Sequence, residues 1–108
     1  MILANYISYF FGGAFLVNAI PHVVSGTMGR AFQSPFAIPR GQGLSSSAVN
    51  VLWGTVNVML AYLLLVHVGE FDLHSIPDFI SALTGGFLLA LYLARHFGRF
   101  NGGNSPGA

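Results

Sequence analysis

AVNVLWGTVNVMLAYLLLVHV, residues 48–68, is the stretch that decides the fold of this chain. It holds no acidic residue, lysine or arginine, and valine and leucine dominate it. A helix of about 20 apolar residues, rising about 1.5 Å per residue, spans the roughly 30 Å hydrocarbon core of a bilayer. Each valine or leucine near its centre favours insertion by about 0.3–0.6 kcal/mol. The stretch therefore predicts a transmembrane helix.

Two more apolar stretches flank it. Residues 2–20 also lack acids, lysine and arginine and predict a second span, although they could instead lie in the membrane interface. Residues 77–94 are shorter, because Asp78 and Arg95 bound them and leave about 24 Å of helix. We expect an all-α integral membrane protein, a three-helix transmembrane bundle. Pro21 is expected to end the first helix, serines 45–47 to cap the second, Gly69 to follow it and Pro77 to open the third.

The composition agrees with a membrane environment. Hydrophobic residues make up 54% of the chain and charged residues 6%, whereas about a quarter of a soluble domain is charged. We expect one transmembrane domain over residues 1–99 and a flexible tail over residues 100–108. The lack of cysteine excludes disulfides and thiolate metal sites, and four basic residues are too few for a nucleic-acid interface. No cofactor and no nucleic-acid partner are expected.

The arginines predict the orientation. Arg30 and Arg40 lie in the connection after the first span, and Arg95 and Arg99 follow the third. With three spans, these two regions are on the same side of the membrane, and the remaining connection carries only acids. By the positive-inside rule we expect the N-terminus outside and the C-terminus in the cytoplasm, in a bacterial inner membrane.

The connection over residues 21–47 is unusually long. Helix connections in bundles usually take about two to eight residues. Its glycines and prolines exclude a regular helix over most of it, yet apolar residues such as Phe32 and Phe36 return between Arg30 and Arg40. We expect an irregular cytoplasmic connection that lies at the level of the lipid headgroups, and an ordered cap over the bundle is the working hypothesis.

Small and polar residues mark the faces on which the helices are expected to pack. Asn57 lies near the middle of the second span, where its amide must find a hydrogen-bond partner. Contact between helices is the preferred interpretation, and a polar path for a transported species is the alternative. The predicted packing residues are Gly54, Asn57 and Ala61, beside Asn50, on the second helix, and Ala82, Gly86, Ala90 and Ala94 on the third.

Several polar and aromatic residues are expected at one depth, close to the cytoplasmic interface. If they converge, they would form a pocket for a lipid headgroup or for an anionic or quinone-like small molecule. The alternative is that they are ordinary interfacial anchors. The candidates are Asn18, His22, Arg30, Asn50, Trp53 and Tyr92.

The short outer connection holds weak candidates for metal ligands. His67, Glu70, His74 and Asp78 would share one face if the helix were continuous, a pattern that suits a divalent ion. Gly69 and Pro77 argue against continuity, so no metal is expected there and a solvated loop is preferred.

Three classes of function remain. The favoured one is a small accessory, assembly or structural subunit that packs through its helices against a membrane-protein partner or a second copy, in contact with membrane lipids. The alternative is a small homo-oligomeric transporter or channel with a polar path around Asn50 and Asn57. The third is a membrane enzyme that acts on a lipid or a quinone-like substrate, although the sequence holds no recognisable catalytic constellation and no enzyme is expected.

Overall fold

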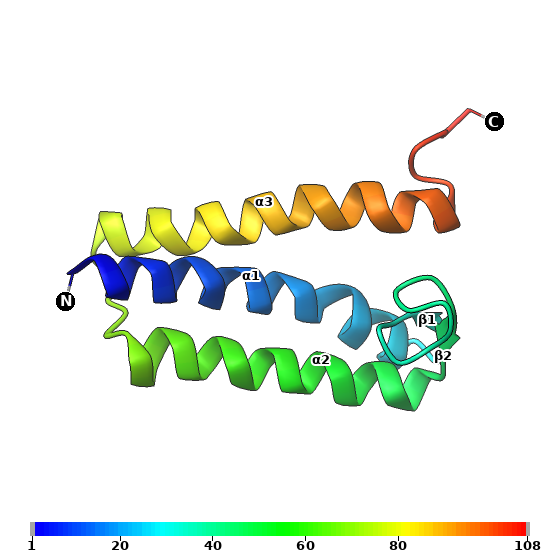
Figure 1. Cartoon of the computed structure of the whole chain (residues 1–108), viewed down its shortest axis with the longest axis horizontal. Helices are drawn as coiled ribbons and strands as arrows, with labels where there is room; N and C mark the ends of the chain where they lie inside the picture. Colours follow the sequence, from blue (N-terminus) through cyan, green and yellow to red (C-terminus); the bar gives the residue numbers. More distant parts are fainter. Residues whose placement is uncertain (1, 108) are drawn as a thin grey trace.

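The computed structural model describes residues 2–107, in which three long helices lie side by side (Figure 1). They are α1, Ile2–Thr27; α2, Ser47–Tyr62, which continues into the π-helical segment η1, Leu63–Val68; and α3, Ile76–Asn101. The middle helix, α1, packs against both others, whereas α2 and α3 hardly contact each other. Each of the three is long and apolar enough to cross a membrane by length and composition. The predicted number of such helices is therefore confirmed.

The first helix is longer than predicted. It passes through Pro21 and ends at Thr27. Gly29 ends it, with φ of 73°, because its N–H donates to the Gly26 carbonyl (3.0 Å) and the Arg30 N–H to the Ser25 carbonyl (2.9 Å). This is the bonding pattern of a Schellman C-cap. Pro21 was wrongly predicted to end the helix, because a proline removes only one backbone bond and neighbouring helices can hold the chain on either side of it.

The helices approach most closely where glycines face a neighbouring backbone. Gly13 of α1 lies against the backbone of Ala82, and Gly85 of α3 against the backbone of Phe10, so that a Cβ atom at either glycine would clash. On the other side of α1, Gly54 of α2 lies against Ala19 and Val23. At these glycines the backbones of α1 and its two neighbours are in direct contact.

The predicted packing faces meet within the chain. Gly54, Asn57 and Ala61 are buried on the side of α2 that faces α1. On α3, Gly86 is buried, and Ala82 and Ala90 are half-buried, while Ala94 is exposed. The first half of this stripe of small residues, Ala82 and Gly86, therefore packs against α1 of the same chain.

The ends of α2 and the start of α3 follow the local signals in the sequence. The Ser46 side chain accepts a hydrogen bond from the Val49 N–H (3.2 Å) and caps α2. Gly69 follows η1, where its N–H donates to the Leu64 carbonyl. Ser75 caps α3, and Pro77 lies in its first turn. The π-helical form of η1 was not predicted, and the Leu64 carbonyl within it accepts a hydrogen bond from the Ser8 hydroxyl of α1.

The third helix also exceeds its prediction. It continues beyond residue 94 to Asn101, where Gly102 ends it with φ of 86°. The predicted boundary followed the loss of apolar residues at Arg95, but a helix can leave an apolar environment without ending. Part of the predicted flexible tail is therefore helical. Beyond it, Asn104 donates a hydrogen bond to the Arg95 carbonyl (2.8 Å).

The long connection forms a folded cap over one end of the bundle, so the fold is not purely α-helical. We use "cap" for residues 28–45. Within it, β1, Phe32–Gln33, pairs antiparallel with β2, Leu44–Ser45. The Ser34 carbonyl accepts from the Gly41 N–H (2.8 Å), and the Gly41 carbonyl bonds His96 Nε2 of α3 (2.7 Å). These bonds hold the cap together and fix it to α3.

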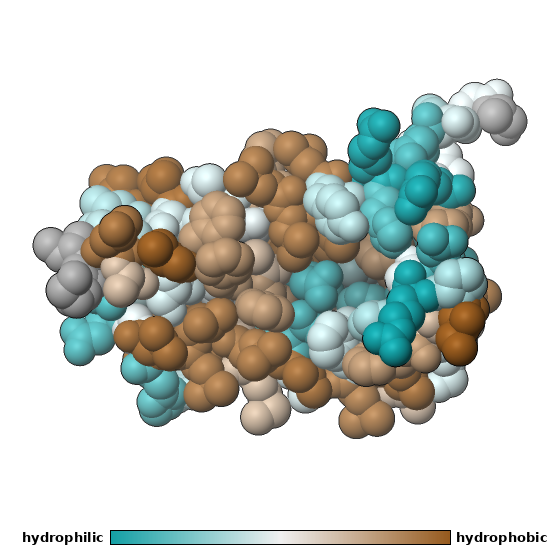
Figure 2. Space-filling model, in the orientation of Figure 1, coloured by the Kyte–Doolittle hydropathy of each residue, from teal (hydrophilic) through white to brown (hydrophobic). Residues whose placement is uncertain are grey.

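The two ends of the molecule differ in charge. All four arginines lie in the cap or in the last turns of α3, at what we call the capped end. The acidic residues lie at the opposite end, between η1 and the first turn of α3. Figure 2 shows hydrophilic residues gathered at the capped end and mainly hydrophobic residues along the rest of this face.

Candidate functional site

His22 is the centre of a buried polar network at the capped end. It lies on α1, its side chain is 2% exposed, and its Nδ1 lies 2.7 Å from Asn50 Oδ1 of α2. Asn50 is itself fully buried, and its Nδ2 faces three backbone carbonyls, those of Phe32 (3.2 Å), Ser45 (3.2 Å) and Ser46 (3.0 Å). The Asn50 side chain thus connects α1 to both strands of the cap and to the start of α2 through hydrogen bonds.

The same bonds determine which nitrogen of His22 carries a proton. Carbonyl oxygens only accept hydrogen bonds, so the amide group that faces them must be the NH₂ of Asn50, and its oxygen must face His22. Because that oxygen also only accepts, His22 Nδ1 must donate. In the neutral imidazole the other nitrogen, Nε2, is then a hydrogen-bond acceptor.

Aromatic rings surround His22. The ring centroids of Phe32, Trp53 and Phe97 lie 5.6 Å, 6.5 Å and 6.1 Å from that of His22, each ring roughly perpendicular to the imidazole. Phe36 of the cap packs edge-on against Trp53 at 5.1 Å. The rings come from the cap, α2 and α3, so the imidazole is fixed on several sides by large rigid groups.

A cavity of about 180 Å³, which we call the inner cavity, lies beside His22 and beneath the cap. Four of the six predicted pocket residues line it, and Asn50 lies directly behind one of these, His22. Gln33 and Ser34 of the cap also line it and were not predicted, whereas His96, which also lines it, was expected at the same depth of the third helix as Tyr92. The predicted lining residues are Asn18, His22, Trp53 and Tyr92.

A second amide pair lies deeper in the bundle. Asn57 is fully buried; its Oδ1 accepts from Asn18 Nδ2 (2.9 Å), and its Nδ2 donates to the Trp53 carbonyl (2.8 Å). Asn57 thus has the partner that its position requires, and the partner is on α1 of the same chain. The Asn18 bond leaves Asn18 Oδ1 available on the wall of the inner cavity.

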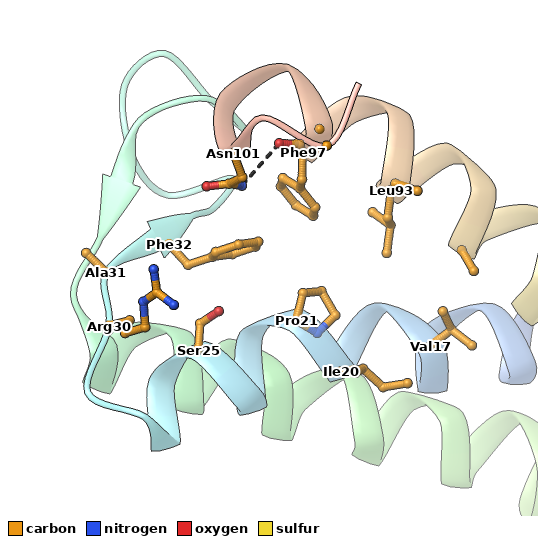
Figure 3. A pocket seen from close by; sticks show the side chains of 14 residues that line it. Val17, Ile20, Pro21, Ser25, Arg30, Ala31, Phe32, Leu93, Phe97 and Asn101 are labelled. Carbon is orange, nitrogen blue, oxygen red and sulfur yellow. Dashed lines mark hydrogen bonds between the residues drawn. The ribbon is translucent and has the colours of Figure 1, made fainter. Parts of the chain in front are cut away.

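Arg30 does not join the other predicted pocket residues. It lies at the mouth of a second, larger cavity of about 670 Å³, which we call the lateral groove, between α1 and α3 (Figure 3). Figure 3 shows the rings of Phe32 and Phe97 between the two helices and Ser25 beside Arg30. The walls are mainly apolar and include Val17, Ile20, Pro21, Ala90, Leu93 and Ala94.

The weak metal-ligand candidates do not converge. The helix is interrupted between Val68 and Ile76, so His67 and Glu70 do not share a face with His74 and Asp78. His74 instead pairs with Asp72 (Nδ1 to Oδ1, 3.3 Å), with both side chains exposed, and Asp78 accepts from the Asp72 N–H (3.0 Å). Within residues 2–107, no group of three or more histidine or acidic side chains could hold a metal ion.

The inner cavity and the lateral groove offer different chemistry. The inner cavity presents hydrogen-bonding atoms between aromatic rings, whereas the lateral groove presents long apolar walls that end at a cation. Either can be the basis for a function. Comparison of the chain with protein-family models, with curated proteins and with solved structures found no match.

Proposed function

We propose that the protein is a small integral membrane accessory subunit that holds an anionic membrane lipid in its lateral groove. Apolar side chains remain exposed along the full length of the three helices. This exposure would be unfavourable in free energy in water, but it costs nothing in lipid. On α1 alone, such residues recur at helical spacing from one end to the other. They are Leu3, Ile7, Phe11, Leu16, Ile20 and Val24.

The proposed orientation rests on the charge asymmetry. All four arginines lie at the capped end, and the acids lie at the opposite end. In a bacterial inner membrane the positive-inside rule then puts the capped end and the C-terminus in the cytoplasm and the N-terminus outside. Basic groups at that level attract the anionic headgroups of the inner leaflet.

The lateral groove is the observation that carries the lipid-binding proposal. Its volume of about 670 Å³ falls within the range of small-molecule sites, roughly 300–1,000 Å³. Val17, Ile20 and Leu93 line the part nearer the middle of the bundle, while Arg30 and Asn101 line the part nearer the cap. A lipid chain fits the first part and a phosphate the second, where Arg30 can bind it with two hydrogen bonds.

The accessory role is preferred to the transport alternative because of the buried amides. A path between copies of the chain would need Asn50 and Asn57 to face a surface that another copy can reach. Neither is exposed, because both have 0% accessible surface, and both make hydrogen bonds within the chain. The outer faces of the helices are apolar and suit contact with lipid or with a membrane-protein partner.

The test is to measure lipid bound to the protein purified from its membrane in a mild detergent. We expect native mass spectrometry to detect bound anionic phospholipid, and Arg30→Gln to reduce its occupancy about tenfold, because one charge-assisted phosphate contact is lost. Arg40→Gln is the matched control, since Arg40 lies in the same cap but outside the lateral groove. Equal losses in both variants would show only general surface attraction and would contradict the proposal.

The same preparation tests the accessory role. We expect the protein to elute with a larger membrane complex that contains other polypeptides. A solitary monomer that keeps its lipid would overturn the accessory role and leave lipid binding intact.

A further inference from the structure

We propose that the inner cavity binds the ring of a neutral, membrane-soluble phenol or hydroquinone, whose hydroxyl group donates a hydrogen bond to His22 Nε2. This site lies beneath the cap among all three helices; it shares Leu93 and Phe97 with the lateral groove, but Arg30 does not line it.

The hydrogen bonds of His22 determine which kind of ligand atom it can bind. Asn50 holds His22 so that Nδ1 donates, which leaves Nε2 as an acceptor in the neutral ring. Only 2% of the surface of His22 is exposed, and His22 lines the cavity. Among the described residues, none makes a hydrogen bond with Nε2. A ligand that satisfies this nitrogen must therefore bring a donor.

The size and the lining of the inner cavity suit a single aromatic ring. The inner cavity measures about 180 Å³, and a cavity of about 150 Å³ in another protein accommodates benzene. Trp53, Tyr92 and Phe97 contribute aromatic surface to its wall. One six-membered ring matches both the volume and the surface, because aromatic rings pack favourably edge-to-face and offset-stacked.

In the part of the chain that the structure describes, the wall of the inner cavity includes no acidic residue, lysine or arginine. Besides the two imidazoles, the polar groups are amides and hydroxyls, among them Asn18 and Gln33. Gln33 Oε1 accepts from Asn101 Nδ2 (3.2 Å), so its NH₂ group remains as a donor. Asn18 Oδ1 remains as a second acceptor. A neutral ring with hydroxyl groups can use these atoms, whereas an anion would be buried without a cation.

The position of the cavity gives such a ligand a route from the membrane. Trp53 of α2 and Tyr92 of α3 both line it, and these two helices hardly contact each other. Tyr92 is largely exposed. A ring that carries an alkyl tail can enter between α2 and α3 and leave its tail in the surrounding lipid.

Trp53 makes the proposal directly testable, because it is the only tryptophan in the chain and lines the cavity. The experiment titrates the full-length protein in detergent micelles with 4-decylphenol and with 4-decylanisole, and follows Trp53 fluorescence. The two probes have the same ring and tail, but only the phenol can donate. We expect saturable binding of the phenol and binding of the anisole about tenfold weaker or more.

Either of two results would overturn the proposal. Equal affinities would mean that the probes only partition by hydrophobicity, and no saturable change with either would mean that the cavity holds only water. This comparison uses the unmodified chain, so it stands even if a variant fails to fold.

His22→Phe then tests the named acceptor. We expect it to weaken phenol binding about tenfold, to the level of the anisole, and to leave anisole binding unchanged. His74→Phe is the matched control, because His74 is an exposed histidine at the opposite end. Arg30→Gln should leave phenol binding unchanged. Loss of phenol binding in Arg30→Gln, or retention in a folded His22→Phe, would contradict the assignment.

Discussion

The two ends of the bundle are built from different interactions. At the capped end, buried amides and His22 hold α1, α2 and the cap together, and both the inner cavity and the lateral groove lie at this end. At the opposite end the contacts are close and mostly aromatic: the Tyr9 ring packs against Gly69 and against Phe71, with centroids 5.4 Å apart.

The two ends therefore differ in the kind of ligand that they can hold. At the acidic end there is a pocket of about 250 Å³ beside Tyr6, Phe10 and Ser81, lined mainly by aromatic and aliphatic side chains. Directional hydrogen bonds at the capped end instead keep polar groups at fixed positions around the inner cavity, because each buried group must keep its partner. Polar packing is thus a property of the inner cavity, whereas the lateral groove has mainly apolar walls.

The largest expected effect comes from breaking the close contact between α1 and α3. Gly85→Leu should destabilise the fold by about 3 kcal/mol or more, because its side chain would collide with the Phe10 backbone and force α3 away from α1. Thermal unfolding in micelles measures it. Ala94→Leu, on the exposed part of the same helix, is the control and should change stability little. A similar loss of stability in both variants would mean that the close contact at Gly85 does not determine how α3 packs on α1.

A smaller but still large effect is expected at the capped end. Asn50→Leu should cost about 2–3 kcal/mol, because it removes the hydrogen-bond partner of His22 Nδ1 and the side-chain bonds to the Phe32 and Ser45 carbonyls. It should also increase proteolytic cutting within the cap, which limited proteolysis would detect. Thr55→Val on the same helix removes only a bond to the Val51 carbonyl and serves as the control. An uncut cap in Asn50→Leu would show that the amide does not hold it.

The smallest expected effect is at the acidic end. Tyr9→Phe removes the hydroxyl that accepts from the Glu70 N–H (3.0 Å) and keeps the ring against Gly69 and Phe71. We expect a loss of about 1 kcal/mol in unfolding free energy, and no change in phenol or lipid binding. A change in either binding measurement would mean that the two ends are coupled, and the contrast between them would fail.

The helices and most of the inner cavity could be predicted from the sequence. Apolar length indicated three helices, and Ser46, Gly69 and Pro77 marked their ends. Asn18, His22 and Asn50 could be placed at a common depth because a helix advances a fixed distance per residue. The end of α1 could not be predicted, because Pro21 resembled a helix terminator. The C-cap at Gly29 is recognised only from its two backbone hydrogen bonds, which the sequence does not show.

The number of apolar helices and the places where the charges gather can be read from the sequence, because both depend on residue type and on a regular period along the chain. Tertiary packing sets the rest: it puts Gly86 of α3 against α1, brings Gln33 to the inner cavity and places Arg30 in the lateral groove. The cap has no repeating period, so the path of its backbone is set by bonds to distant residues such as Asn50 and His96. Those bonds exist only after the helices have come together.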